Sequence, residues 1–474
     1  MGDIFSADGW LNGVVTMLQD YIWTYVLIAV LLGCALWFTL RSGFVQFRML
    51  GEMFRLLGSS SKKSDKEGKH ISSFQAFAVS VASSVGTGNL AGVALAISTG
   101  GAGAIFWMWL IALLGSATAF VESTLAQLFK TRGEHSFIGG PAYYMKKGLH
   151  LPWMGSIFAV LLTCTFGFSY NSIQSNTICS AMEKAFGVDP LIMGIILTVI
   201  ALSIVFGGIQ RISKVSSVLV PIMAIGYVIL AVVIIGMNIS MIPGILKQIF
   251  VQAFGIEQFA GGTLGAVLMT GIKRGLFSNE AGEGSAPNAA ATSDVSHPVK
   301  QGLIQALAVF TDTILICSCT AFIILISGEY QNGLSDGIVL TQSALEHEVG
   351  SIGSIFIAFA ILSFAFSSII GNYFYGETNV RYLTKSKVVL TLYRLCSGGV
   401  VVMFGAVASL QLVWSFGDLF MALLTGCNLI AVILLSKYPM RLLKDYRAQR
   451  KAGKDPTFHR SQFPEISDEL ECWE

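Results

Sequence analysis

The stretch Ser84–Asn89, Ser-Val-Gly-Thr-Gly-Asn, interrupts an apolar segment that is long enough to cross a membrane. Glycine is about 1 kcal/mol worse than alanine in a helix interior, and Gly86 and Gly88 flank a threonine here. The segments 74–81 and 90–97 are therefore predicted to be two half-helices joined by unwound backbone. Lipid cannot pair with free backbone N–H and C=O groups, so unwound backbone at this depth is tolerated only where it lines a cavity inside the protein. A glycine-rich packing face is the alternative for this stretch alone.

The composition indicates an integral membrane protein rather than a soluble one. Of the 474 residues, 54% are hydrophobic and only 12% are charged, and the net charge of +2 gives no indication of a nucleic-acid partner. The eight cysteines are scattered, mostly in apolar segments and without a Cys-x-x-Cys pair, so we predict buried apolar side chains rather than a metal site. The first twenty residues contain no Lys or Arg, so the basic region of a cleavable signal peptide is missing.

Apolar runs of spanning length predict an all-α, polytopic membrane protein with 11 transmembrane helices. The runs are 22–40, 74–99, 104–129, 153–181, 190–208, 215–236, 259–290, 302–327, 351–380, 391–409 and 411–436. With this count, every connection that is rich in Lys and Arg falls on the same side of the membrane. Because basic loops stay in the cytoplasm, we predict a cell (inner) membrane protein with its N-terminus outside and its C-terminus in the cytoplasm. The charged tail Leu442–Glu474 has little apolar periodicity, so we expect it to be loosely attached beside the anionic membrane surface.

The run 259–290 contains a second interruption. Lys273 and Arg274 fall near its middle, and small or polar residues follow from Gly275 to Gly284. A charge at the bilayer centre costs at least about 2.5–3.5 kcal/mol, so these side chains must face protein or water. We therefore predict a second discontinuous span, broken at Gly275–Gly284.

The two interrupted spans occupy corresponding positions in two groups of five spans. They run in opposite directions, because five spans separate their starts, and such a pair points to a secondary transporter with a binding site at the membrane midplane. The predicted organisation is an N-terminal outside segment with one extra helix (1–41), a cytoplasmic loop (42–73), a first five-helix repeat (74–236), an extracytoplasmic connection (237–258), a second five-helix repeat (259–437) and a cytoplasmic tail (438–474).

Several stretches carry a resemblance to a known family. They are Phe74–Phe77, Val85–Val93, Gly101–Trp109, Gly139–Tyr144, Arg274–Gly282 and Tyr375–Glu377. Within residues 70–440 the chain resembles the alanine/glycine:cation symporters, also called the sodium:alanine symporter family, of the amino acid-polyamine-cation superfamily. The resemblance implies a leucine-transporter-like fold, a 5+5 inverted repeat with one extra N-terminal helix. It also implies that Na⁺, or alternatively H⁺, is transported together with a small neutral amino acid.

An amino-acid substrate needs N–H donors for its carboxylate, and the N-terminus of a half-helix supplies them. We assign this role to the backbone of Thr87, Gly88 and Asn89, with Gly86 and Gly88 allowing close approach of the ligand. Further candidates for the substrate site are Phe277, Ser278, Asn279, Asn372 and Phe168. Phe168 belongs to a polar and aromatic stripe with Tyr170, Asn171 and Gln174, which helix packing explains equally well.

Na⁺ is a hard cation and prefers oxygen ligands, as other hard cations do. The resemblance to the leucine-transporter fold implies one sodium site at the Ser84 carbonyl and the Asn89 side chain. A second site would combine the carbonyls of Ala82 and Val85 with the hydroxyls of two serines, Ser367 and Ser368. Hydrogen bonds from these serines to their own helix are the alternative.

Charged residues within the predicted spans must find partners, because buried charges usually pair. We predict a gating or charge-compensation network, with direct substrate contact as the alternative. Its members are Lys273, Arg274, Glu280, Glu283, Glu122, Asp312 and Glu377, with Asp418 as a further partner.

The expected function is Na⁺-coupled uptake of alanine or glycine by alternating access. In the family a tryptophan often stands where this chain has Asn372; the smaller polar residue would widen the pocket and keeps glutamine or another neutral amino acid open. A channel needs a constriction along a continuous pore, and a membrane enzyme needs a nucleophile–base pair or metal ligands. Neither pattern is present, so we predict no enzyme activity. The lipid bilayer, the amino acid and the ion are the expected partners, with no nucleic acid and no obligatory protein partner.

Overall fold

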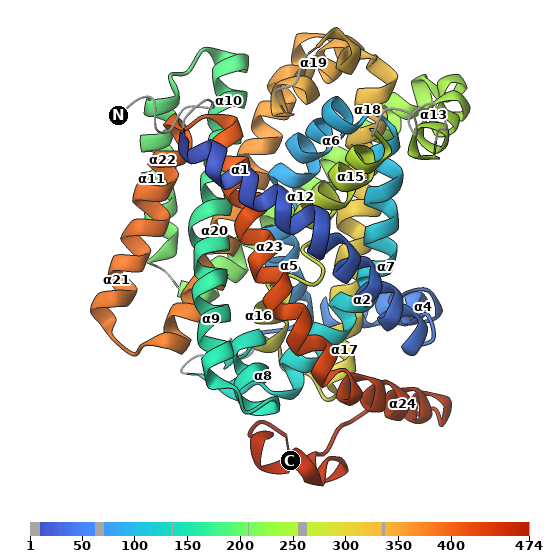
Figure 1. Cartoon of the computed structure of the whole chain (residues 1–474), viewed down its shortest axis with the longest axis vertical. Helices are drawn as coiled ribbons and strands as arrows, with labels where there is room; N and C mark the ends of the chain where they lie inside the picture. Colours follow the sequence, from blue (N-terminus) through green and yellow to red (C-terminus); the bar gives the residue numbers. More distant parts are fainter. Residues whose placement is uncertain are drawn as a thin grey trace.

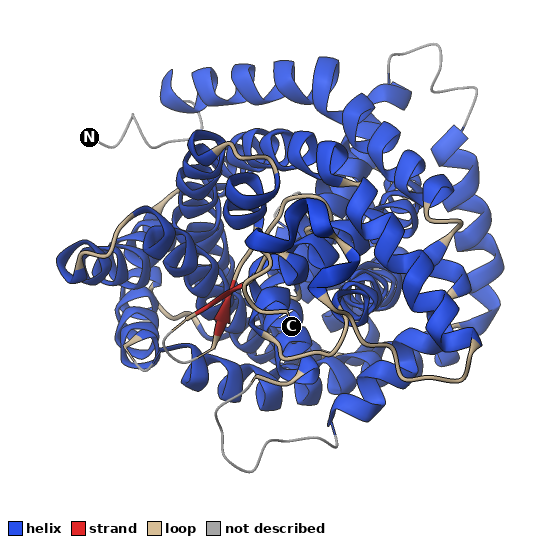
Figure 2. Ribbon diagram, turned by 90° about the horizontal axis from the view of Figure 1, so that it is seen from below, coloured by secondary structure: helices blue, strands red, loops and turns tan. Residues whose placement is uncertain are grey.

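Helices make up almost the whole computed structural model, which describes residues 10–61, 71–133, 136–206, 208–254, 263–333 and 337–473 (Figure 1). Within these ranges the strands are the antiparallel pair β1 (Thr131–Arg132) and β2 (Phe137–Ile138) (Figure 2). Among the described residues, 7 helices are long and apolar enough to cross a membrane, or up to 9 spans if each of two bent helix pairs is counted as one. The chain is therefore a multi-pass membrane protein.

The helices of the first half are α1 (Trp10–Ile22), η1 (Trp23–Leu27), α2 (Ile28–Arg41), α3 (Val45–Arg48), α4 (Leu50–Ser61), α5 (Ser73–Ser84), η2 (Gly88–Gly92), α6 (Val93–Gly100), α7 (Gly103–Leu128), α8 (Pro141–Gly148), α9 (Pro152–Leu162), η3 (Thr163–Tyr170), α10 (Asn171–Phe186), α11 (Pro190–Val205), α12 (Gly208–Met237), η4 (Ile239–Met241) and α13 (Ile242–Phe254). Those of the second half are α15 (Thr263–Asn279), α16 (Ala286–Thr292), α17 (Pro298–Val309), η5 (Phe310–Cys317), α18 (Ser318–Ser327), η6 (Glu329–Asn332), α19 (Gly337–Val349), α20 (Ser351–Leu383), α21 (Lys387–Leu395), η7 (Cys396–Val400), α22 (Val401–Val407), α23 (Leu410–Leu435), α24 (Lys437–Lys451), η8 (Arg460–Gln462) and η9 (Pro464–Glu469).

The prediction of an all-helical membrane protein is confirmed, whereas the count of eleven spans and the two repeats stay predictions. Most of the predicted runs coincide with long apolar helices. The run 190–208 is the shorter helix α11, and the run 215–236 lies within α12. The first span is longer than predicted, because Asn12–Arg41 is helical throughout. The run 259–290 corresponds to α15 and α16, although its first residues, 259–262, lie outside the described part.

The predicted interruption at Ser84–Asn89 is confirmed as a bend between two helices. A capping box starts α5, where the backbone N–H of Gln75 donates to the Ser72 hydroxyl (3.2 Å) and the Gln75 side chain accepts from the Ser72 N–H (2.9 Å). The helix ends where Val85 adopts an extended conformation. The axes of Ser73–Ser84 and Gly88–Gly100 differ by 48°. The glycines therefore allow the change of direction that their helix propensity predicts.

The described part of the connection 237–258, residues 237–254, is largely helical. Helix α13 is bent by 76° from the end of α12 and packs against the start of α7. There the Gln252 side chain accepts a hydrogen bond from the Ala102 N–H (2.8 Å), and the Phe106 and Phe254 rings lie 4.7 Å apart. A Cβ atom on Gly103 would lie 2.5 Å from the Gln252 backbone. Glycine at this position is therefore required for the close approach of the two helices.

The C-terminal tail is docked onto the protein, which corrects the expectation that it is loosely attached. Leu442, Leu443 and Tyr446 are buried on one face of α24, and Phe463 and Trp473 are buried beyond it. The indole N–H of Trp473 donates to the carbonyls of Gln127 (3.2 Å) and Leu128 (3.1 Å) at the end of α7. Phe463, Ile466, Leu470 and Trp473 are buried at intervals of three or four residues. The expectation of little apolar periodicity overlooked this short pattern among charged residues.

Polar contacts fix the tail to several elements of the same face. Lys147 on α8 lies 2.8 Å from Glu471, and its hydrogen bond holds the pKa of that carboxyl below its usual range. His297, just before α17, lies 3.2 Å from Asp445. Burial lowers the pKa of His297 to about 4, so the ring is neutral at pH 7 and this contact is a hydrogen bond rather than an ion pair.

Trp473→Ala should release the tail, because it removes two indole hydrogen bonds and a buried ring. Truncating a buried aromatic side chain costs about 3–5 kcal/mol. Trypsin should then cleave the purified full-length protein after Lys451 or Lys454 several-fold faster than the unmodified protein, as measured by mass spectrometry of the products. Ser461→Ala, at an exposed position of the same tail, should leave the rate unchanged. Equal rates in the two variants would show that Trp473 does not hold the tail.

Candidate functional site

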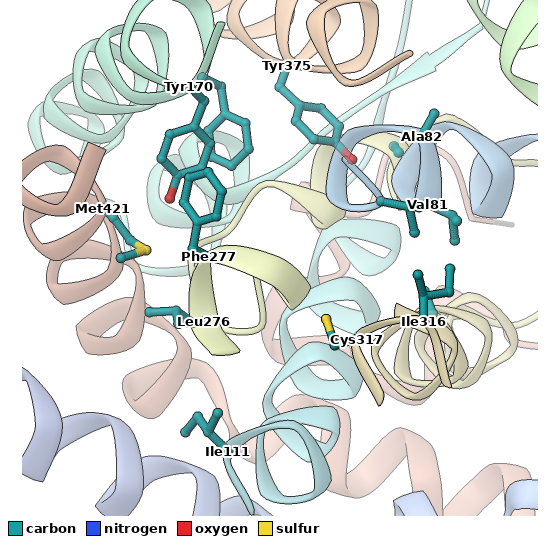
Figure 3. Close-up of a cluster of buried hydrophobic side chains, with 14 of the residues drawn as sticks. Val81, Ala82, Ile111, Tyr170, Leu276, Phe277, Ile316, Cys317, Tyr375 and Met421 are labelled. Atoms are coloured by element: carbon teal, nitrogen blue, oxygen red, sulfur yellow. The ribbon is translucent and has the colours of Figure 1, made fainter. Parts of the chain in front are cut away.

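The two predicted interruptions lie against each other in the interior of the protein. A Cβ atom on Gly88 would lie 3.0 Å from the Ser278 Cα atom and 3.1 Å from the Phe277 ring. The Asn89 side-chain amide also donates to the Ser278 hydroxyl (3.2 Å). Figure 3 shows the surrounding apolar side chains, with Phe277 beside Tyr170. Residues 189 positions apart in the sequence are thereby brought into one site.

Asn89 connects the first interruption to η5. Its side-chain oxygen accepts a hydrogen bond from the backbone N–H of Gly86 (2.9 Å), while its NH₂ group donates to the Asp312 carboxylate (2.8 Å). The Ser278 hydroxyl also donates to Asp312. The Asn89 oxygen is thus hydrogen-bonded to Gly86, and the first sodium site, at the Ser84 carbonyl and the Asn89 side chain, stays a prediction.

Gln174 on α10 provides the acceptor at the start of the second half-helix. Its side-chain oxygen accepts from the backbone N–H of Thr87 (3.0 Å) and from the Thr87 hydroxyl (2.7 Å). A Cβ atom on Gly86 would lie 2.9 Å from this oxygen and 2.3 Å from the Ser368 hydroxyl. The Thr87 N–H, which was predicted to bind the carboxylate of the substrate, therefore binds an oxygen atom here, that of Gln174. Gln174 itself was only one member of a stripe that packing explained equally well.

Oxygen atoms of the second predicted sodium site come together between α5 and α20. The Ser368 hydroxyl lies 3.0 Å from the Ala82 carbonyl and 3.3 Å from the Val85 carbonyl, and the Ser367 hydroxyl lies 3.3 Å from the Ala82 carbonyl. Both serines also donate to the carbonyl of Phe364 on their own helix. The hydrogen bonds within one helix, which were the alternative to a sodium site, are therefore present as well. Carbonyl and hydroxyl oxygens in one buried group fit the ligand preference of a hard cation such as Na⁺.

The second interruption lies later in the chain than Gly275–Gly284. Helix α15 continues to Asn279, and the irregular backbone spans Glu280–Ser285. Glu280 has a φ of 56° and Gly284 a φ of 83°, in the region that favours glycine. Gly275 is helical, and a Cβ atom there would lie 2.6 Å from the Ile111 side chain. This glycine therefore serves close packing against α7 rather than a break.

Carboxyl groups gather around the second interruption, and each is hydrogen-bonded to neutral groups. Glu280 accepts from the Ser83 hydroxyl (3.1 Å), and Glu283 accepts from the Tyr170 hydroxyl (3.1 Å). Glu122 accepts from the backbone N–H of Gly282 (3.1 Å) and from the Asn428 amide (2.8 Å). Serine, tyrosine and asparagine side chains thus bring α5, η3 and α23 to this break.

The seven residues of the predicted charge network do not form one network. Arg274 is paired with Asp418 and lies 4.4 Å over the Trp414 ring. Lys273 is paired with Asp20 on α1 at 3.3 Å. Glu377 lies 2.7 Å from Arg381 and 3.1 Å from Arg394, at the end of α20.

Four buried acids stand apart from these pairs. Within the described ranges, no ion pair involves Glu122, Glu280, Glu283 or Asp312.

The sequence reasoning missed Asp20, the partner of Lys273, because the predicted first span began only at residue 22.

The remaining substrate candidates are placed differently. The Phe277 ring lies 4.7 Å from the rings of Tyr170 and Trp414, measured between centroids. Asn279 donates to the Thr313 hydroxyl (3.2 Å). Phe168 is not brought to the first interruption but lines a separate apolar cavity with residues of α22 and α23.

Asn372 on α20 lies beside the end of α5. Its side-chain oxygen lies 2.7 Å from the Ser83 hydroxyl, whereas its NH₂ group has no hydrogen-bond partner although the residue is only 1% exposed. A buried donor without a partner costs about 1–3 kcal/mol. Asn372 therefore offers a free donor close to the first interruption.

The chain matches known proteins over nearly its whole length. A family model described as the sodium:alanine symporter family matches residues 8–460. The chain is 52% identical to the "Probable sodium/glutamine symporter GlnT" of Bacillus subtilis (strain 168), over 98% of this chain and 96% of that protein. It is 37% identical to the "Sodium/alanine symporter AgcS" of Methanococcus maripaludis, over 92% and 98% of the two chains. The crystal structure of a manganese transporter from Eremococcus coleocola, 14% identical, superposes with a TM-score of 0.51 over 84% of each chain and shows a similarity of fold alone.

Asp418→Asn should destabilise the protein strongly, because it leaves the buried Arg274 guanidinium without its counter-charge. Removing one partner of a buried ion pair costs about 3–5 kcal/mol. Glu465→Gln is the control, since both side chains of the Arg441–Glu465 pair are exposed, at 48% and 41%, and exposed pairs contribute about 0–1 kcal/mol. Thermal unfolding of the purified proteins should therefore show a much larger loss for Asp418→Asn. Similar losses in both variants would contradict the structural role of the Arg274–Asp418 pair.

Proposed function

The chain belongs to the sodium:alanine symporter family, and from this premise we propose that it couples inward Na⁺ movement to the uptake of a neutral amino acid by alternating access. Members of this family are transporters rather than enzymes. The observation that carries the proposal is the first interruption. There the Thr87 N–H at the start of a half-helix binds an oxygen acceptor. Beside it lies a buried group of oxygens, the carbonyls of Ala82 and Val85 and the hydroxyl of Ser368.

The proposed architecture has eleven spans, with two five-helix repeats after the first helix. The N-terminus lies outside and the C-terminus in the cytoplasm. The first interruption contacts the last turn of α15, and the Ser83 hydroxyl donates to Glu280 at the second interruption (3.1 Å). These contacts support the arrangement, because inverted repeats place their broken helices at a shared midplane site. The placement of Lys and Arg supports the orientation.

The amino-acid carboxylate binds at Thr87 in the proposed mechanism. It takes the backbone N–H and hydroxyl that Gln174 now uses, and the dipole of the following helix favours its negative charge. The ammonium group needs acceptors on the opposite side. Asp312 is the candidate, because it accepts hydrogen bonds from Asn89 at the first interruption and from Ser278 in the last turn of α15, just before the second.

Na⁺ binds between α5 and α20 in the same proposal. The ligands are the carbonyls of Ala82 and Val85 and the hydroxyls of Ser367 and Ser368, which would turn away from the carbonyls toward the ion. This ion fixes α5 against α20 when it is bound, so its affinity and that of the substrate are coupled. H⁺ coupling is the alternative, and the buried carboxyl groups of Glu122, Glu280 and Glu283 would then carry the proton.

Glutamine becomes the first candidate substrate, ahead of the alanine or glycine expected from the sequence. The free NH₂ group of Asn372 can donate to the side-chain oxygen of glutamine, and alanine and glycine have no such group. The relative with 52% identity is named as a glutamine symporter, which supports the same choice. Alanine remains the second candidate, because the relative from Methanococcus maripaludis is named for alanine.

Uptake by the purified protein in proteoliposomes tests the function directly. Labelled glutamine should accumulate with an inward Na⁺ gradient and fail to accumulate when choline replaces Na⁺. A pH gradient in the absence of Na⁺ separates proton coupling from sodium coupling. Uptake that does not depend on any cation gradient would refute symport.

Ser368→Ala should weaken Na⁺ binding, because it deletes one proposed oxygen ligand. Contacts to charged groups contribute about 1.5–3 kcal/mol, so the Na⁺ concentration for half-maximal uptake should rise about tenfold or more. Ser363→Ala is the control, since the Ser363 hydroxyl bonds only to the Phe359 carbonyl on the same helix. An unchanged Na⁺ dependence in Ser368→Ala would remove this serine from the ion site.

Asn372→Ala should reduce the preference for glutamine. The lost hydrogen bond should lower kcat/KM for glutamine about tenfold, corresponding to about 1.4 kcal/mol. Alanine uptake by the same variant is the internal control and should change little. A parallel loss of both activities would mean that Asn372 acts on the fold of the site rather than on selectivity.

A further inference from the structure

Two arginine side chains from distant parts of the chain meet at the turn that follows α2. The Nη1 atoms of Arg48 and Arg447 lie 3.4 Å and 3.8 Å from the position that a Cβ atom on Gly43 would take. Arg447 also donates to the Ser42 carbonyl (3.1 Å), which fixes its guanidinium group on this turn. Arg41 precedes the turn and donates to the Ser436 hydroxyl (3.1 Å). We call Arg41, Arg48 and Arg447 the arginine cluster.

No acidic residue neutralises the arginine cluster within the part of the chain that the structure describes. Glu52 on the neighbouring helix α4 is engaged by Arg55 (2.7 Å) and Arg450 (3.2 Å) instead. Burial, and then the nearby charge of Arg48, lower the pKa of Arg447. Like charges at short range repel each other, so an anion between them would stabilise this arrangement.

The cluster lies where the apolar surface of the protein ends. Leu36, Trp37 and Leu40 on α2 are about half exposed, at 49%, 52% and 55%. The Arg41 guanidinium lies 5.5 Å from the centre of the Trp37 ring. Exposed aromatic residues next to basic ones are typical of the boundary between hydrocarbon and lipid headgroups. Figure 1 shows α2 and α4 beside each other, with α24 below them.

We propose that the arginine cluster binds the phosphate of an anionic phospholipid whose acyl chains lie along the exposed face of α2. Guanidinium groups match phosphate oxygens through paired hydrogen bonds, which makes arginine suited to such a site. The exposed apolar residues on α2 provide a surface for acyl chains that a free phosphate ion would leave uncovered. The bound lipid would connect α2 to α24, which are far apart in the sequence but joined here by the Arg447–Ser42 hydrogen bond.

Native mass spectrometry of the purified full-length protein with added phosphatidylglycerol or phosphatidylcholine tests this site. The unmodified protein should retain phosphatidylglycerol more strongly. Arg48→Gln combined with Arg447→Gln should lower that retention about tenfold or more, because each basic residue beside anionic lipid contributes about fivefold. Arg48→Lys with Arg447→Lys should restore it in part, since charge is kept while the paired geometry is lost.

The matched control removes two charges elsewhere on the same tail. Lys454→Gln combined with Arg460→Gln, both exposed positions, should retain phosphatidylglycerol like the unmodified protein. Equal loss in the control and the cluster variant would overturn the site in favour of general charge attraction. Equal retention of the two lipids by the unmodified protein would overturn it as well. Displacement of the lipid by an equal concentration of inorganic phosphate would identify a site for a soluble anion and would also overturn the proposal.

Discussion

The structure depends on pairing backbone groups that two broken helices leave free in the interior of a membrane protein. At the first break, the N–H groups of Gly86 and Thr87 bond to side chains of Asn89 and Gln174. At the second, the N–H and C=O groups of Gly282 bond to Glu122 and Asn428. Lipid offers no such partners. Helices α7, α10 and α23 are therefore held around the breaks by the same hydrogen bonds that make the breaks possible.

Charge is distributed unevenly around this centre. Arg274 and Lys273 have carboxylate partners on α23 and α1. By contrast, Glu122, Glu280 and Glu283 accept hydrogen bonds from hydroxyl, amide and backbone groups. The carboxyl groups at the second break therefore depend on uncharged donors from other helices, and each buried hydrogen bond lost without replacement costs about 1–3 kcal/mol.

Local features of the sequence predicted the helices, whereas most contacts between the helices could not be predicted from them. Gly86 and Gly88 located the first break, since low helix propensity acts locally. Gly275 misplaced the second, because a glycine that allows close helix packing has the same local properties as one that ends a helix. The serines Ser367 and Ser368 were assigned to carbonyls that they do reach. Asp20 and the docked tail were missed, because their partners are far away in the sequence.

In the proposed mechanism, a ligand that binds at the first break must displace the side chain of Gln174. Its amide oxygen already holds the Thr87 N–H and hydroxyl, so in the proposed mechanism an incoming carboxylate would replace one oxygen acceptor with another. The net gain is the difference between two similar sets of hydrogen bonds, plus the interaction of the added charge with the helix dipole. The carboxylate, which all amino acids share, would then contribute little to affinity in the proposed mechanism. Discrimination among them, and the rate at which they leave, is set by the groups that surround their side chains.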